Sequence, residues 1–266
     1  MTVAVAFLCP DGVVVAADSM ITPTLGGMGV GHHTGRKVYN CPGQQVFAWA
    51  GDMGLASRAR LLVEGNPASA GNFATPLAYV HAISVEINKQ FSDTQVQNRD
   101  AAACFVGFPY GGQPQCCVFW MGMQPMLFDP DHFYFALGSG KLSADPFLKF
   151  LVDVFCPNNT RPSVHLAAFL AVWTVQHAID TTQGQVAPPI RAAMIEQAAA
   201  GLQSRELSDP EIGTHIQAKQ AGEKALRDWR AAVQSGAAAQ GAQPPVPQPA
   251  AAQPAAAAPV GNNPIV

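Results

Sequence analysis

Residues 2–19, TVAVAFLCPDGVVVAADS, decide the fold. Residues 2–9 form a run of valine, alanine and other apolar residues that is typical of a β-strand, and residues 13–17 form a second such run. Between them stands Asp11-Gly12, one of the strongest sequence signals for a tight hairpin turn. The stretch therefore predicts an antiparallel hairpin that opens the chain and leads into Asp18.

Thr2 directly follows the initiator methionine, and methionine aminopeptidase removes Met1 when the next side chain is this small. Thr2 would then carry both a hydroxyl and a free α-amine. An α-amine has an ordinary pKa of roughly 7.7–8.0, so near neutral pH it can accept the proton of the hydroxyl. We expect Thr2 to act as nucleophile with its own amine as base, although Met-Thr is also an ordinary start for a cytosolic protein.

The rest of the chain alternates pairs of strands and pairs of helices. We expect a loop at 22–35 and a hairpin of 36–41 with 46–51, and then helices at 52–64 and 75–91. Further strands are expected at 102–108, 115–121, 125–129 and 133–140, helices at 144–155 and 163–179, a strand at 186–195 and a helix at 209–233. This order favours an α+β fold in which two antiparallel sheets pack face to face with helices outside each, a four-layer αββα sandwich.

The C-terminal end differs in composition from the rest. From about residue 235 the chain is almost wholly Ala, Pro, Gln, Gly, Val and Asn, with neither charge nor aromatic residue. Such a segment cannot bury enough apolar area to offset chain entropy. We expect one folded domain over 2–234 and a disordered Ala/Pro/Gln-rich tail over 235–266.

Composition excludes several functions. A net charge of −3 with 12% charged residues argues against nucleic-acid binding. No apolar run reaches the ~18 residues of a membrane span, and the first residues make a poor signal peptide, so we expect a cytosolic protein. The six cysteines show no C-x-x-C or zinc-like spacing and are interpreted as reduced packing residues. Low charge combined with 48% hydrophobic residues indicates a surface covered by other copies of the chain.

A series of short motifs resembles the proteasome β-type family of N-terminal nucleophile (Ntn) hydrolases, including the bacterial heat-shock-locus peptidase. The motifs are the N-terminal Thr2, A-A-D-S at 16–19, Lys37-Val38, Ala50-Gly51, G-S-G at 138–140 and Asp180. The resemblance implies a threonine-type endopeptidase built into stacked homo-oligomeric rings, acting on peptides or unfolded proteins without a cofactor. It leaves open an ATPase unfoldase as a partner.

Amide attack by a threonine hydroxyl needs a nearby cation, and a carboxylate to hold that cation in place. Lys37 and Asp18 suit these roles if the second and third strands adjoin; the alternative is a buried pair that serves only stability. The resemblance implies that the Gly51 backbone N–H binds the oxyanion, for which the alternative is a helix-start glycine. It also implies that Ser139 and Asp180 support the Thr2 amine.

Other positions concern the substrate. By resemblance Trp49 shapes the specificity pocket, where an indole would favour small or medium side chains, although Trp49 can also be a core residue. Gln183 stands where the family usually has a serine and would contact substrate through its amide. His32-His33 could line the cleft or, given a third ligand, bind a metal. Gly138–Lys141 lacks the spacing of a phosphate loop.

Two other functions stay open. An Ntn amidohydrolase would use the same nucleophile on a small amide, and ring assembly around a chamber would argue against it. A non-catalytic structural ring subunit would need no nucleophile, and the complete set of motif residues argues against that.

Overall fold

The structure is a computed structural model that describes residues 2–25, 28–29, 31–68, 73–182, 184 and 186–234. The predictions made for Gln183 and for the tail at 235–266 lie outside these residues.

The predicted N-terminal hairpin forms the middle of the first sheet. Strands β1 (Ala4–Cys9) and β2 (Gly12–Ala17) pair antiparallel in the register Ala4↔Ala17 to Cys9↔Gly12. On the β1 side lies β12 (Tyr134–Leu137), and on the β2 side lie β13 (Arg191–Ala198) and then β14 (Gly201–Glu206). Every residue of β1 and β2 is buried, because both faces of this sheet are covered.

The second sheet has the order β11-β10-β9-β8-β7, again with antiparallel pairs throughout. Its strands are β7 (Val38–Cys41), β8 (Gln45–Gly51), β9 (Ala102–Tyr110), β10 (Gln113–Trp120) and β11 (Gln124–Leu127). The predicted hairpin of β7 with β8 and the predicted turn at Gly111-Gly112 between β9 and β10 are both confirmed.

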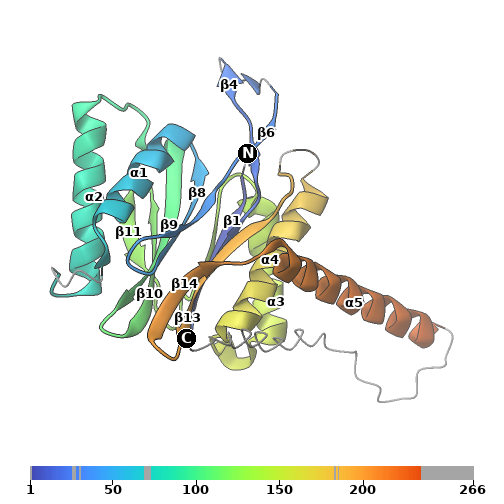
Figure 1. The fold of residues 1–266 in the computed structure, drawn as a ribbon. Coiled ribbons are helices and arrows are strands. Elements are labelled where there is room, and N and C mark those ends of the chain that lie inside the picture. The colour runs from blue at the N-terminus through green and yellow to red at the C-terminus, as the bar shows by residue number, and fades with distance from the viewer. Residues whose placement is uncertain are drawn as a thin grey trace, which may run out of the picture.

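Helices cover the outer face of each sheet (Figure 1). On the second sheet lie α1 (Met53–Gly65), capped by Asp52, and α2 (Pro76–Asp93), capped by Thr75 as predicted. On the first sheet lie α3 (Lys141–Phe155) and α4 (Val164–Thr181), and the long α5 (Asp209–Gln234) packs on α4 and then extends away from the body. Short 3₁₀ turns occur at Arg99–Ala101 and Pro157–Asn159. The result is the predicted four-layer αββα sandwich, the Ntn-hydrolase fold.

Three local predictions were wrong. Residues 22–35 are not a plain loop, because β3 (Met20–Ile21) pairs with β6 (His33–Thr34) and β4 (Thr24–Leu25) pairs with β5 (Met28–Gly29). The strand expected at 186–195 starts only at Arg191, since Pro188 and Pro189 have no backbone N–H to donate to a sheet. Helix α3 starts three residues earlier than expected, at Lys141.

Strand β14 was missed altogether. Only Leu202 of its six residues is buried, because β14 is an edge strand with little contact to the core. A polar edge strand lacks the apolar alternation by which strands are recognised.

Among the residues that the structure describes, no helix is long and apolar enough to cross a lipid bilayer.

Candidate active site

Thr2 lies just before β1, where the loop between β12 and α3 wraps around its backbone. The Thr2 nitrogen donates to Ser139 Oγ at 3.2 Å, and the Gly140 nitrogen donates to Thr2 O at 3.0 Å. Gly138 has φ +89°, and a Cβ there would stand 2.2 Å from Thr2 O. The G-S-G motif therefore holds Thr2 in place through both its backbone nitrogen and its carbonyl oxygen.

The Thr2 hydroxyl meets Lys37. Lys37 Nζ donates to Thr2 Oγ1 at 2.8 Å and to Asp18 Oδ1 and Oδ2 at 2.9 and 3.0 Å. Asp18 follows β2 and Lys37 precedes β7, two strands that belong to different sheets. The two strands adjoin, as the proposed roles required, and the two side chains meet because the sheets pack face to face.

Backbone donors compensate the buried carboxylate. Asp18 Oδ1 accepts from the Val3 nitrogen and Oδ2 accepts from the Met20 nitrogen, both at 3.0 Å. The Asp18 and Lys37 side chains are 0% and 1% exposed. Burial lowers the pKa of Lys37 below its ordinary value, and the charge and hydrogen bond of Asp18 oppose that shift. Lys37 is thus a desolvated cation held against the Thr2 hydroxyl.

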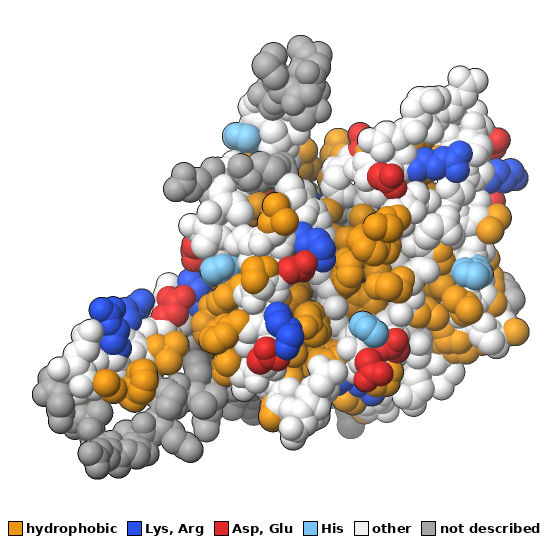
Figure 2. Space-filling view, turned by 180° about the vertical axis from the view of Figure 1, so that it is seen from behind, with side chains coloured by type: hydrophobic (Ala, Val, Ile, Leu, Met, Phe, Trp, Pro, Cys, Tyr) orange, Lys and Arg blue, Asp and Glu red, His pale blue; other side chains and the backbone are white. Residues whose placement is uncertain are grey.

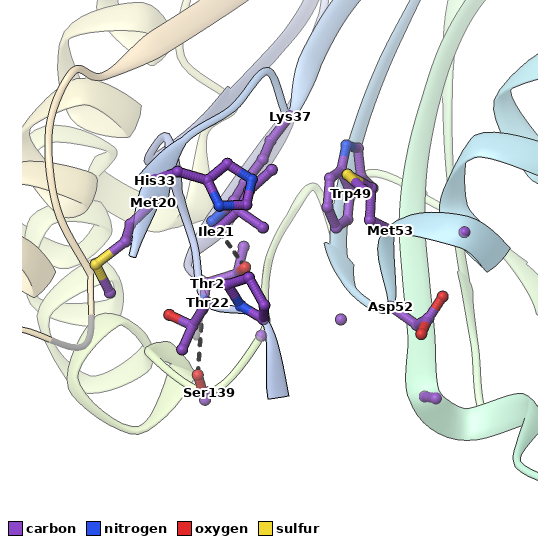
Figure 3. Close-up of a pocket in the computed structure, with 15 residues that line it drawn as sticks. Thr2, Met20, Ile21, Thr22, His33, Lys37, Trp49, Asp52, Met53 and Ser139 are labelled. Atoms are coloured by element: carbon purple, nitrogen blue, oxygen red, sulfur yellow. Dashed lines mark hydrogen bonds between the residues drawn. The ribbon is translucent and has the colours of Figure 1, made fainter. Parts of the chain in front are cut away.

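A cleft of about 660 Å³ opens in front of Thr2 (Figure 3). In the close-up, Thr2, Lys37 and Ser139 lie on one side and Trp49, Asp52 and Met53 lie on the other. Gly51 also lines the cleft, at the end of β8 and with φ +93°. The N-terminus of α1 follows immediately, so its partial positive charge lies at the rim of the cleft.

Trp49 lies both at the cleft and in the core. Its side chain lines the cleft and also packs in the core between the second sheet and helices α1 and α2. Its indole nitrogen donates to Arg36 O at 3.3 Å, and its backbone nitrogen donates to Lys37 O at 3.1 Å. Trp49 therefore helps to position the segment that carries Lys37.

Asp180 is not brought to Thr2. Its carboxylate accepts from Gln176 Nε2 at 2.7 Å and from Lys219 Nζ at 3.0 Å, and its side chain is 47% exposed. The packing of α5 beside α4 brings Lys219 to Asp180, which does not line the cleft, and motif order alone does not reveal this contact. The other predicted catalytic residues are Thr2, Asp18, Lys37, Gly51 and Ser139, and they lie together around the cleft.

Sequence reasoning missed much of the cleft wall. Met20, Ile21, Thr22 and Pro23 line it, as does Met53 at the start of α1. The only sequence signal was the length of the segment at 22–35, which was interpreted as a loop near the substrate. Its His33 does line the cleft, while His32 Nδ1 lies 3.0 Å from Thr22 Oγ1. Within the described ranges, no group of three or more His, Cys, Asp or Glu side chains could hold a metal ion.

The fold and these contacts define an α+β sandwich of the Ntn type with a threonine just before strand β1 of the first sheet. Solved structures with this fold include Anbu (ancestral beta-subunit) from Yersinia bercovieri, with 15% identity and a TM-score of 0.63 over 91% of this chain and 98% of that chain. The helical assembly of the Anbu complex from Pseudomonas aeruginosa matches with 16% identity and a TM-score of 0.63 over 85% and 96%. An Anbu Gly-1 mutant from a Hyphomicrobium strain matches with 17% identity and a TM-score of 0.64 over 87% and 97%.

These comparisons correct the family drawn from the motifs. The assignment to the proteasome β-type peptidases and the heat-shock-locus peptidase was wrong, since the similar structures reported above are Anbu proteins. At 15–17% identity this likeness shows the fold. No protein-family profile matches the chain, and no curated protein matches its sequence.

Proposed function

We propose that this chain is a threonine peptidase, a hydrolase that cleaves peptide bonds with Thr2 as nucleophile after removal of Met1. One observation carries the proposal: the Thr2 hydroxyl lies 2.8 Å from a buried lysine that is itself held by a buried carboxylate, at the floor of an open cleft. An Asp18–Lys37 pair that served stability alone would not need to lie beside a hydroxyl group at the floor of a cleft.

The proposed reaction has two steps. Thr2 Oγ1 attacks the carbonyl carbon of the substrate while its proton passes to the α-amine, and the Lys37 ammonium stabilises the developing alkoxide. The Gly51 N–H, at the end of β8, donates to the oxyanion. The C–N bond breaks, the leaving amine takes the proton from the α-amine, and water then hydrolyses the Thr2 ester. Ser139 orients the amine, because it already accepts a hydrogen bond from the Thr2 nitrogen.

The cleft supports a peptide substrate. Its volume of about 660 Å³ accommodates several residues, and its walls combine polar groups with the apolar side chains of Met20, Trp49 and Met53. The buried indole of Trp49 limits the depth of the cleft, so we propose that the substrate carries a small or medium uncharged side chain at the cleaved position. An Ntn amidohydrolase with a small amide substrate would use the same nucleophile and is the second candidate.

We further propose that the active form is a homo-oligomer of stacked rings. The Pseudomonas aeruginosa neighbour is described as a helical assembly, so an open helical stack is the alternative geometry. Peptides or unfolded chains need no unfolding step, whereas folded proteins would require an ATPase partner.

The test is a peptide boronate or epoxyketone directed at Thr2. Intact mass should show loss of Met1 and one adduct per chain, and Thr2→Ala should lower peptide hydrolysis by roughly 10³-fold or more. Thr214→Ala is the matched control, since Thr214 is exposed on α5 and its hydroxyl donates to Pro210 O of the same helix. Retained Met1 without an adduct would contradict the proposal and favour a non-catalytic subunit, and full hydrolysis by Thr2→Ala would contradict Thr2 as the nucleophile.

A further inference from the structure

A second, smaller cleft lies behind the Thr2 site. It has a volume of about 370 Å³ and is lined by Ser19, Thr34, Gly35, Arg36, Pro189, Arg191 and Glu206. None of these residues lines the Thr2 cleft. The proposed hydrolysis uses none of them.

The two clefts share the same two chain segments. Asp18 and Lys37 contribute to the Thr2 site, while their immediate neighbours Ser19 and Arg36 line the second cleft. Successive side chains of an extended segment point to opposite faces, so neighbouring residues are expected to line different clefts. The Gly35 nitrogen donates to Ser19 O at 2.8 Å and ties the two segments together. A ligand in the second cleft would therefore touch the chain next to both members of the Asp18–Lys37 pair.

Ser19 places a buried hydroxyl group at the second cleft. The residue is 1% exposed, and its hydroxyl oxygen has no hydrogen-bond partner among the residues that the structure describes. A buried hydroxyl without a hydrogen-bond partner destabilises the fold, and a ligand that accepts from it would relieve that cost. Thr34 brings a second hydroxyl to the same cleft.

Two guanidinium groups supply hydrogen-bond donors to the second cleft. Arg36 donates through Nε to Val38 O and through Nη2 to Glu206, and Arg191 donates through Nη1 to Asp209. Within the described part of the chain this leaves Nη1 of Arg36, and Nε and Nη2 of Arg191, for a ligand. Glu206 and Asp209 each pair with one guanidinium, so these four groups sum to a net charge of zero and the remaining N–H groups are what the cleft offers to an anion.

We propose that this second cleft binds an oxyanion, a carboxylate or phosphate group, between Arg36 and Arg191 with Ser19 and Thr34 as further donors. Planar guanidinium forks match both anions geometrically, and a hydroxyl donates to either. The two sources of the anion are a phosphate compound and the terminal carboxylate of a peptide.

The test is isothermal titration of the full chain at constant ionic strength with inorganic phosphate, with N-acetylglycine, and with N-acetylglycinamide as the uncharged match. Saturable binding of phosphate or of the carboxylate is expected, with none for the amide, and the tighter of the two anions identifies the source. Arg191→Gln should weaken binding by roughly tenfold or more, because it removes a charge-assisted contact. Ser19→Ala, nearly isosteric, should weaken it by a smaller factor.

Arg58→Gln is the matched control, because Arg58 lies on α1, donates to Thr94 and does not line the cleft. It should bind the anions as the wild type does. Absence of saturable binding by the wild type would overturn the proposal, and so would equal affinity in wild type, Arg191→Gln and Ser19→Ala. The readout is binding, so failure here is separate from failure of the Thr2 assignment.

Discussion

Lys37 is fully buried, yet its ammonium group contacts three oxygens, one from Thr2 and two from Asp18. Burial of an ion pair is tolerated only when the desolvated charges are paired and their remaining lone pairs are bonded. Asp18 meets that condition through its two backbone donors. The Asp18–Lys37 pair therefore affects both stability and the site. Removal of one partner leaves the other charge buried and unpaired, and it also changes the surroundings of the Thr2 hydroxyl.

A double-mutant cycle tests this dependence. Lys37→Met and Asp18→Asn should each destabilise the fold, Lys37→Met by about 3–5 kcal/mol, because each leaves a buried group without its partner. The double variant should lose much less than the sum, as measured by urea unfolding. Lys37→Arg should restore charge but not hydrolysis, since a guanidinium is larger and cannot act as a compact point charge. Additive losses would show that the two residues act separately.

Gly138 is a second residue on which the site depends. Gly138→Ala should lose more stability than Gly112→Ala, although both glycines have positive φ, of +89° and +75°. The left-handed conformation costs roughly 1–2 kcal/mol in each variant. Only Gly138 adds a clash, because its Cβ would meet Thr2 O, whereas a Cβ at Gly112 meets nothing within 4 Å. Thermal unfolding of the pair measures the difference, and equal losses would contradict the close approach.

At the scale of elements, α4 is the central helix of its layer. It packs on β1 and β2 and is covered by α3 and α5, and eleven of its residues are buried. Near its C-terminal end, the ring of His177 stacks on Phe147 of α3 with centroids 3.9 Å apart. Burial lowers the pKa of His177, aided by Lys219 and opposed by Asp180 and Glu223. The contact between α3 and α4 thus contains an imidazole that is more stable when neutral.

This shift predicts a dependence of stability on pH. The folded-state pKa of His177 lies below its unfolded value of about 6.5, so between the two values the unfolded chain binds more protons. The contribution is complete above about pH 6.5 and is lost as the pH falls through the folded value. Urea midpoints at pH 7.5 and 5.5 should differ less for His177→Gln than for wild type. His81→Gln, at an exposed position on α2, should keep the wild-type difference.

At the scale of the whole molecule, both outer helical layers present large apolar side chains to solvent. Leu61 on α1, Val85 on α2 and Leu142 on α3 are 59%, 67% and 90% exposed. Figure 2 shows apolar side chains gathered in broad patches over one face of the molecule. Patches of this kind on a chain with few charges mark interaction surfaces.

Native mass spectrometry of the full chain should therefore show a homo-oligomer at micromolar concentration, and electron microscopy should distinguish closed rings from an open helical stack. Added salt should not dissociate it, because the contacts expected from these side chains are apolar rather than ionic. A monodisperse monomer would contradict self-assembly and favour the amidohydrolase with a small amide substrate.

Local patterns of the sequence were sufficient for the αββα layers and for most element boundaries. Asp11-Gly12 determined the first hairpin, and Asp52 and Thr75 marked the starts of α1 and α2, because turns and caps depend on residues that are neighbours in the chain. The motif residues Thr2, Asp18, Lys37, Gly51 and Ser139 also stood out before their distances were known.

Tertiary packing decided the rest, because these features depend on contacts between residues far apart in the chain. Asp18 and Lys37 meet where two sheets stack, and Asp180 pairs with Lys219 because α5 packs beside α4. The second cleft likewise joins Ser19 and Arg36 to Arg191 and Glu206, from opposite ends of the chain. The spacing of residues along the sequence is enough to predict a turn or a helix cap, because both are local. Which side chains meet across the domain depends on which layers pack against each other.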